Sequence, residues 1–123
     1  MRFFNKNYDF IGIGDTVTDA FIELEEADVE KNDGLVKICM RFGDKIPYKD
    51  VNIIPAVGNS ANASVSASRL GLKSAFVSNL GDDYYGKECL DVFKAEKVGT
   101  DFIKINKNKK TNYHYVLLFH AER

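Results

Sequence analysis

The first polar residues that could do chemistry follow a short apolar run near the N-terminus. The run from Tyr8 to Gly14 ends in glycine, and the segment Asp15-Thr16-Val17-Thr18-Asp19 comes directly after it. Asp19 is the leading candidate for a ligand contact, because one carboxylate can accept hydrogen bonds from two neighbouring sugar hydroxyls. The alternative is that Asp15 or Asp19 closes a turn through its own backbone. The sequence leaves both interpretations open.

A second polar cluster lies where a glycine precedes a predicted helix, in the segment Pro55-Ala56-Val57-Gly58-Asn59-Ser60-Ala61-Asn62. Gly58 would let the backbone approach a ligand closely, and the first turn of a helix offers free N–H groups. Asn62 can both donate and accept, which suits a neutral ligand rich in hydroxyls better than an anion. The competing interpretation, which the segment alone favours, is helix capping by Asn59 or Ser60 with Asn62 facing water.

Common nucleotide and metal motifs fail in this sequence. Gly12-Ile13-Gly14 follows an apolar run, but Val17 occupies the third glycine position of a dinucleotide-binding G-x-G-x-x-G. No G-x-x-x-x-G-K-[ST] occurs, which excludes a P-loop. Gly81-Asp82-Asp83 with Gly86 lacks the remaining oxygen ligands of a calcium loop, so we interpret it as a turn.

Charge and composition argue against several classes of partner. The 123 residues carry 17 basic and 18 acidic side chains, so no global field attracts nucleic acid or an anionic membrane. Residues 106–110 are interpreted as a solvated hairpin turn. Cys39 and Cys89 show no zinc-ligand spacing, and two buried thiols are expected. His114 and His120 have no Ser or Cys partner argued by sequence and are interpreted as structural. With no signal peptide or membrane-spanning run recognised, we expect a cytoplasmic protein.

The elements that must position these residues alternate along the chain. Residues 20–54 combine an acidic stretch with alternating segments around Asn32-Asp33-Gly34, which is typical of antiparallel strands. The remainder predicts a largely parallel sheet sandwiched by helices, with ligands beyond the carboxyl ends of its strands. The first strand is expected to be buried on both faces. The expected elements are strands at 8–14, 73–80, 101–105 and 112–120 and helices at 59–70 and 85–97.

These segments together resemble the ribokinase-like (PfkB) carbohydrate kinases. The most specific stretch is VGNSANASVSASRLG, residues 57–71, which is similar to the family's glycine pair, asparagine, small-residue helix and Leu-Gly ending. SAFVSNLGDDYYG, residues 74–86, resembles the next strand and its Gly-Asp-Asp-x-x-Gly turn. Val98-Gly99-Thr100 resembles a helix exit, and Lys110-Thr111 followed later by Glu122-Arg123 resembles the family's closing hairpin.

The resemblance implies a partial fold: a Rossmann-like, ribokinase-type α/β sandwich with a small antiparallel β lid inserted after the first strand. Residues 1–19 and 55–123 would form the α/β core, and residues 20–54 the lid. Such a lid closes over the sugar and excludes water, which limits wasteful hydrolysis of ATP. Lids of this family often pair between subunits, so the resemblance also implies a homodimer formed through the lid.

Residue by residue, the resemblance implies a substrate site for a sugar or nucleoside. Asp19 matches the family's sugar-hydroxyl aspartate, Gly58 and Asn59 its glycine-plus-polar pair, and Asn62 its sugar-binding asparagine. Glu122 matches a late acidic contact more loosely.

At two positions this sequence departs from the family's pattern in ways that bear on substrate specificity. Val57 replaces the first glycine of the pair, which changes how closely the backbone can approach there. Val17 stands where ribokinase itself has asparagine, which weakens ribose as the specific substrate. The sequence does not name the sugar.

The larger departure concerns catalysis. The family's Asp-Thr-x-Gly-Ala-Gly-Asp stretch, which carries the catalytic base, does not occur, and Gly14-Asp15-Thr16 only looks like a piece of it. Activation of a sugar hydroxyl and stabilisation of the phosphoryl group need that stretch. ATP and Mg²⁺ are implied for a complete enzyme, with their sites outside this chain. We therefore expect the chain alone to be catalytically silent.

Three hypotheses follow. The first is the N-terminal, sugar-binding part of an ATP-dependent carbohydrate kinase. The second, from a different class, is a non-catalytic module that binds sugar or dimerises through its lid. An unrelated nucleotide-binding α/β domain is the third.

Overall fold

The computed structural model describes residues 7–120, which fall into two units by their contacts. The first unit comprises Met1–Asp19 and Ile54–His114, and the second comprises Ala20–Ile53 and Tyr115–Arg123. This division groups residues from Tyr115 onward with the insertion, whereas the predicted core runs to residue 123. Glu122, one of the predicted contact residues, lies outside the described residues.

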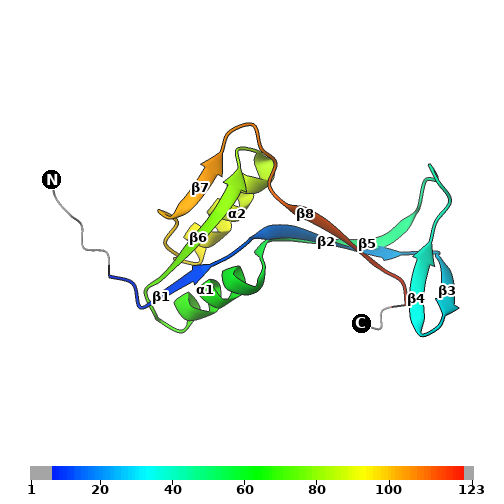
Figure 1. The fold of residues 1–123 in the computed structure, drawn as a ribbon, viewed down its shortest axis with the longest axis horizontal. Coiled ribbons are helices and arrows are strands. Elements are labelled where there is room, and N and C mark those ends of the chain that lie inside the picture. The colour runs from blue at the N-terminus through cyan, green and yellow to red at the C-terminus, as the bar shows by residue number, and fades with distance from the viewer. Residues whose placement is uncertain (1–6, 121–123) are drawn as a thin grey trace. The chain divides into compact units, whose positions relative to one another are not determined.

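The first unit is built on a three-stranded parallel sheet with the strand order β1-β6-β7 (Figure 1). The register aligns Gly12 of β1 with Phe76 of β6, and Ser78 of β6 with Ile103 of β7. The central strand, β6, is buried along most of its length, as expected for an interior parallel strand. The strands are β1 (Phe10–Ile13), β6 (Ser74–Gly81) and β7 (Ile103–Asn106).

Two helices, α1 (Asn59–Arg69) and α2 (Tyr84–Ala95), pack on this sheet. The residues of α1 that face the sheet are small: Ala61, Ser64 and Ala67 are buried. A Cβ at Gly12 would clash with Ser64 Oγ, so the small side chains on both sides set the close approach of helix and strand. Neither described helix is long and apolar enough to span a membrane.

The core of this unit lies between the sheet and the helices. The rings of Phe76 and Phe93, both fully buried, have centroids 5.1 Å apart in a tilted arrangement. Cys89 is also buried there, and burial raises the pKa of its thiol. Cys39 is half-buried, so the expectation of two buried thiols is confirmed only for Cys89, and both thiols are free. The buried cluster consists of Ala56, Ala61, Phe76, Leu80, Cys89, Phe93 and Val98.

Both helices cover the same face of the parallel sheet. Gly12 faces α1, and Phe76, which shares its register position, contacts Phe93 of α2. The alternate residues of β1, Ile11 and Ile13, therefore point to the opposite face, where they are 47% and 73% exposed. The expectation that the first strand is buried on both faces is wrong for this chain.

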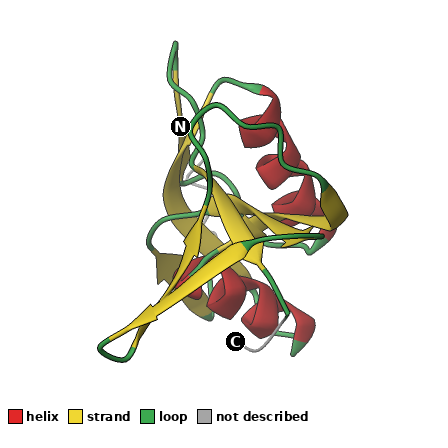
Figure 2. Cartoon of the chain, turned by 90° about the vertical axis from the view of Figure 1, so that its right-hand side faces the viewer, coloured by secondary structure: helices red, strands yellow, loops and turns green. Residues whose placement is uncertain are grey.

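A second, three-stranded sheet has the order β5-β2-β8, and a separate hairpin pairs β3 with β4 in antiparallel register (Figure 1). Figure 2 shows the strands in yellow and the two helices in red from a second direction. Asp33 and Gly34 both have positive φ, as a two-residue hairpin turn requires, which confirms the turn predicted there. The strands are β2 (Val17–Leu24), β3 (Asp28–Asn32), β4 (Leu35–Cys39), β5 (Tyr48–Val57) and β8 (Tyr113–Leu118).

Candidate functional site

Asp19 lies inside a strand, not in a loop as the sequence predicts. β2 begins at Val17, and the side chains of Thr16, Val17 and Thr18 are all buried. Asp19 itself is half-buried, with 24% of its side chain exposed. A carboxylate in a strand cannot close a turn, so that alternative for Asp19 is wrong.

The carboxylate of Asp19 faces an imidazole. Nδ1 of His114, on β8, lies 3.2 Å from Oδ1 of Asp19. That oxygen is nevertheless buried without a hydrogen-bond partner among the described residues, so the imidazole is close but its N–H is not aligned with the oxygen. The pair attracts as an ion pair when His114 is protonated. Buried polar atoms are almost always hydrogen-bonded, so the unsatisfied Oδ1 of Asp19 needs an explanation.

Asp15, at the other end of the same segment, is held by Asn112, which directly precedes β8. Asn112 Nδ2 donates to Asp15 Oδ2 at 2.8 Å, and the backbone N–H of Thr18 donates to the carbonyl of Asn112 at 3.1 Å. On the other side, Thr16 Oγ1 donates to the carbonyl of Val57 at 3.2 Å. The segment 15–19 is therefore fixed from two directions, which limits the positions that Asp19 can adopt.

The N-terminus of α1 approaches this segment through Gly58. Gly58 has a φ of 131°, a conformation that favours glycine, and a Cβ there would lie 2.9 Å from the carbonyl oxygen of Asp15. Gly58 is itself the N-cap of α1, and no side chain caps the helix. Ser60 Oγ donates instead to the carbonyl of Ile13 at 2.8 Å, so the predicted capping by Asn59 or Ser60 is wrong.

Asn59 and Asn62 are exposed in the first turn of α1. Neither makes a hydrogen bond to Asp19 within the part of the chain that the structure describes. Asn62 lies on the wall of a cavity of about 410 Å³, which is within the size range of small-molecule sites. The cavity is lined by Ile54, Pro55, Ala56, Val57, Asn62, Val65, Ser66, Arg69, Val92 and Glu96.

The structure thus brings Gly58 against the Asp15 loop, but it places Asp19 and Asn62 in separate surroundings. Asp19 is not part of the cavity wall, and Arg69 and Glu96 on that wall form an ion pair with hydrogen bonds of 2.8 and 2.5 Å. The contact roles of Asp19, Gly58, Asn59 and Asn62 stay predictions.

A polar network around Asp83 positions the segment that leads to His114. Asp83 caps α2 by accepting from the N–H of Gly86 at 2.9 Å, and it also accepts from Oγ1 and N of Thr111 at 2.7 and 3.0 Å. Burial acts to raise the pKa of Asp83, but the hydrogen bonds from Thr111 and Gly86 outweigh it and hold that pKa below its ordinary value. The turn predicted at residues 81–83 is confirmed.

Asn112 and His114 are the polar neighbours of the site that sequence patterns do not reveal. The one available signal is the alternation of His114 with Tyr113 and Tyr115, which places the imidazole on the opposite side of the strand from both tyrosines. Which strand lies beside it depends on the pairing of β8 with β2, and no local pattern encodes that pairing. The sequence predicts a solvated hairpin turn at residues 106–110. The structure has a turn at residues 107–108, but β7 and β8 belong to different sheets, so the two strands form no hairpin.

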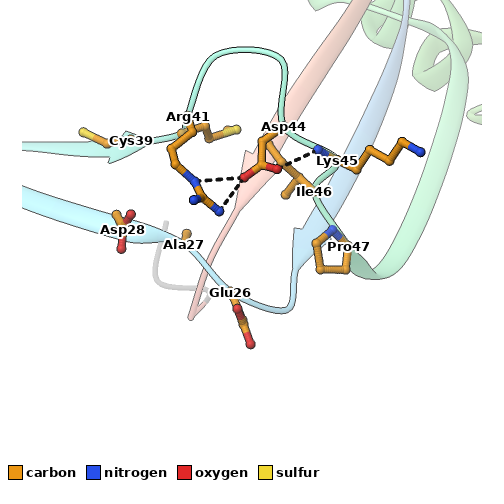
Figure 3. A pocket seen from close by; sticks show the side chains of 10 residues that line it. Glu26, Ala27, Asp28, Cys39, Arg41, Asp44, Lys45, Ile46 and Pro47 are labelled. Atoms are coloured by element: carbon orange, nitrogen blue, oxygen red, sulfur yellow. Dashed lines mark hydrogen bonds and ion pairs between the residues drawn. The ribbon is translucent and has the colours of Figure 1, made fainter.

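A smaller cavity of about 200 Å³ lies in the second unit (Figure 3). Two of its charged side chains pair with each other: Arg41 Nε and Nη2 lie 3.1 and 3.0 Å from Asp44 Oδ2, and the backbone N–H of Lys45 donates to Asp44 Oδ1. We assign it no ligand. Among the described residues, no group of three or more His, Cys, Asp and Glu side chains could hold a metal ion.

Comparison with known sequences identifies the class of protein. Residues 42–123 match the pfkB family of carbohydrate kinases, and the chain belongs to that family. It is 39% identical over 61 residues to a fructokinase of Solanum tuberosum, covering 50% of this chain and 19% of that protein. It is 38% identical over 78 residues to the ribokinase of Bacillus subtilis, covering 63% of this chain and 26% of that protein.

Solved structures agree with the fold. Arabidopsis thaliana ribokinase complexed with ribose and ATP superposes with a TM-score of 0.76 at 21% identity, over 94% of this chain and 34% of that one. Halothermothrix orenii fructokinase gives a TM-score of 0.64 at 29% identity, over 89% of this chain and 33% of that one. The predicted ribokinase-like α/β fold is confirmed as a partial fold, since the chain spans about a third of the solved relatives.

Proposed function

We propose that this chain is the N-terminal, sugar-binding part of an ATP-dependent carbohydrate kinase that phosphorylates a hydroxyl of a sugar or nucleoside. Membership of the pfkB family supports the kinase chemistry. The observation that carries the binding role is Oδ1 of Asp19, a buried carboxylate oxygen without a hydrogen-bond donor among the described residues. Sugar hydroxyls are donors of the kind that this oxygen lacks.

In the proposed site, each predicted residue has a separate task. Asp19 accepts from a sugar hydroxyl and so fixes the orientation of the ring. Gly58 keeps the N-terminus of α1 close to segment 15–19, where free N–H groups can meet the sugar. Asn62 supplies both a donor and an acceptor from the cavity wall. Asn59 and Glu122 are retained as further contacts on the family resemblance alone.

Phosphoryl transfer itself is proposed to need groups beyond these residues. A relative, the Arabidopsis ribokinase, was solved with ribose and ATP. In the described part of this chain, no group of three or more His, Cys, Asp and Glu side chains could hold a metal ion. A magnesium-bound ATP would supply the phosphoryl group in the complete enzyme. The isolated chain is therefore proposed to bind sugar without phosphorylating it, in the cytoplasm.

The alternative is a non-catalytic module that binds sugar or dimerises through its lid. The observation in its favour is the set of exposed apolar side chains in the second unit, a feature typical of surfaces that associate. A homodimer formed through the lid is also compatible with the kinase proposal. These side chains are Val29, Leu35, Val36, Met40, Phe42, Ile46, Tyr48, Ile53, Tyr115 and Leu117.

Calorimetric titration with D-fructose, D-ribose and adenosine tests the binding role. We expect at least one of them to bind the wild-type chain, and Asp19→Asn to weaken that binding about tenfold or more, because a hydrogen bond to a charged acceptor is lost. Asp15→Asn is the matched control, since Asp15 already accepts from Asn112. Equal affinities of wild type and Asp19→Asn would remove Asp19 from the site.

A further inference from the structure

The imidazole of His114 lies beside the proposed sugar contact and is largely open to solvent. Its Nδ1 is 3.2 Å from Oδ1 of Asp19, and 60% of the His114 side chain is exposed, against 24% for Asp19. A hydroxyl bound to Oδ1 of Asp19 at an ordinary distance of about 2.7 Å would therefore lie within about 6 Å of Nδ1. A sugar held by Asp19 thus has the imidazole within reach of its neighbouring hydroxyl.

Hydrogen bonds from the residues just before His114 hold its backbone in place. The N–H and Oγ1 of Thr111 donate to the carboxylate of Asp83 at 3.0 and 2.7 Å. Nδ2 of Asn112 donates to Asp15 at 2.8 Å. These anchors lie two and three residues before His114, so only its side-chain torsions remain to be ordered when a ligand binds. Such preorganisation lowers the entropy lost on binding.

Asp19 and His114 together present two hydrogen-bond acceptors. A neutral imidazole carries one N–H and one acceptor nitrogen. The carboxylate beside Nδ1 favours the tautomer with its proton on Nδ1, which leaves Nε2 as the acceptor. Within the described residues, Nε2 of His114 makes no hydrogen bond, and Oδ1 of Asp19 has no donor. The two atoms suit two donors on neighbouring positions of one ligand, and adjacent sugar hydroxyls are such donors.

We propose that His114 is a specificity-determining residue of the sugar site. Its Nε2 accepts from the hydroxyl next to the one that donates to Oδ1 of Asp19, so the site selects a ligand with two adjacent hydroxyls. The proposal rests on the proposed function, because Asp19 must bind the first hydroxyl. An analogue without the second hydroxyl leaves Nε2 unpaired, and sites built to bind a hydroxyl discriminate against such analogues. Because the imidazole is largely exposed, water partly replaces the missing group, and the expected discrimination is about tenfold.

Calorimetric titration of the 123-residue chain with deoxygenated analogues tests this role. Whichever of D-fructose, D-ribose and adenosine binds the wild type is compared with its analogues that lack one hydroxyl each, such as 2′-deoxyadenosine and 3′-deoxyadenosine. We expect two of these analogues, which lack adjacent hydroxyls, to bind the wild type about tenfold more weakly than the parent ligand. His114→Ala should weaken binding of the parent ligand about tenfold. It should leave binding of the analogue that lacks the second hydroxyl unchanged.

His114→Gln and His114→Asn form a matched pair of variants. The amide group of glutamine reaches the position of Nε2, whereas that of asparagine reaches only the position of Nδ1. We expect His114→Gln to keep most of the discrimination and His114→Asn to lose it. The pair also decides the test if His114→Ala does not fold. Circular dichroism of each variant checks the fold, which should be intact because the His114 side chain is largely exposed.

The remaining outcomes separate this proposal from the proposed function. If the His114 variants weaken binding of the parent ligand and of every analogue by the same factor, His114 only orients Asp19 and the proposal is overturned. Unchanged binding in all three His114 variants overturns it as well. In both cases the wild type still binds its sugar, so the proposed function stands. If the wild type binds none of D-fructose, D-ribose and adenosine, both are contradicted.

Discussion

The two units of this chain bury very different shares of their apolar side chains. In the first unit, Phe76 and Phe93 are fully buried between a sheet and two helices. In the second unit, every residue of β3 is exposed, and so are Leu35 and Val36 of β4. A hairpin without a second layer has nothing to bury its apolar side chains against. The first unit thus has a core of its own, whereas the β3–β4 hairpin of the second leaves Leu35 and Val36 exposed.

The largest loss of stability is expected from a substitution in the core of the first unit. Phe93→Ala should lower the free energy of unfolding by about 3–5 kcal/mol, because it leaves a cavity beside Phe76. Phe42→Ala, in the second unit, should change it by less than about 0.5 kcal/mol, since Phe42 is exposed. Urea denaturation followed by circular dichroism measures both. Similar losses for the two variants would contradict the contrast between the units.

The next effect concerns Asp83, whose carboxylate joins α2 to the segment before β8. Asp83→Ala removes the cap of α2 and leaves the Thr111 donors without their acceptor, so we expect a loss of about 1–2 kcal/mol. Asp82→Ala, an exposed neighbour without such contacts among the described residues, is the control. Thermal unfolding of the two variants side by side gives the difference, and equal melting temperatures would count against the network.

The carboxylate of Asp83 should also make the stability of the fold depend on pH. Because the hydrogen bonds hold the pKa of Asp83 lower in the folded than in the unfolded chain, its contribution is present above the unfolded pKa and is lost as pH falls through the folded pKa. Wild type should therefore lose more stability than Asp83→Asn between about pH 5 and pH 2. Parallel pH curves of the two proteins would show that Asp83 contributes nothing.

Two glycine substitutions with smaller expected effects separate the cost of backbone strain from the cost of a close contact with a neighbouring atom. Gly58 and Gly71 both have positive φ, so Gly71→Ala should cost about 1 kcal/mol through strain alone. Gly58→Ala should cost more, because its Cβ would also press on the Asp15 carbonyl oxygen, whereas nothing lies within 4 Å of a Cβ at Gly71. Chemical denaturation of the two variants provides the test, and an equal cost would mean that the close approach has no energetic weight.

The smallest effect belongs to the charged pair in the second unit. Arg41→Ala removes its contact with Asp44, but 87% of the Arg41 side chain is exposed and solvent screens the pair. We expect a change in unfolding free energy within about 0.5 kcal/mol. A loss above 1 kcal/mol in the urea experiment would show that the Arg41–Asp44 pair stabilises the second unit more than a solvent-screened surface pair does.

Local patterns predict the elements of this chain well. The small residues of segment 57–71 predict a helix that approaches a sheet closely, and α1 does so over Gly12. The Asp33-Gly34 turn and the Gly81-Asp82-Asp83 turn are also encoded locally, by residues that tolerate positive φ or cap a helix. These features need no knowledge of distant parts of the chain.

The features that depend on distant segments are the ones the sequence does not predict. An apolar run such as Phe10–Ile13 predicts a strand that is buried on both faces. The run alone does not indicate that Ile11 and Ile13, on one face of β1, are exposed. The contact of His114 with Asp19 depends on which strands become neighbours. Asp19 lies inside β2, next to the buried side chains of Thr16 and Thr18. Threonine is a polar residue, so the sequence does not predict that these two side chains are buried.

The first unit is proposed to bind the sugar through Asp19. A two-dimensional NMR titration of the 123-residue chain with D-fructose, D-ribose and adenosine tests it most directly. We predict that the ligand which binds shifts the amide signals of Asp19, Gly58, Asn62 and His114 and leaves those of the Asp33-Gly34 turn unchanged. Shifts confined to the hairpin or to the cavity around Arg41, or no shift with any of the three ligands, would contradict the claim.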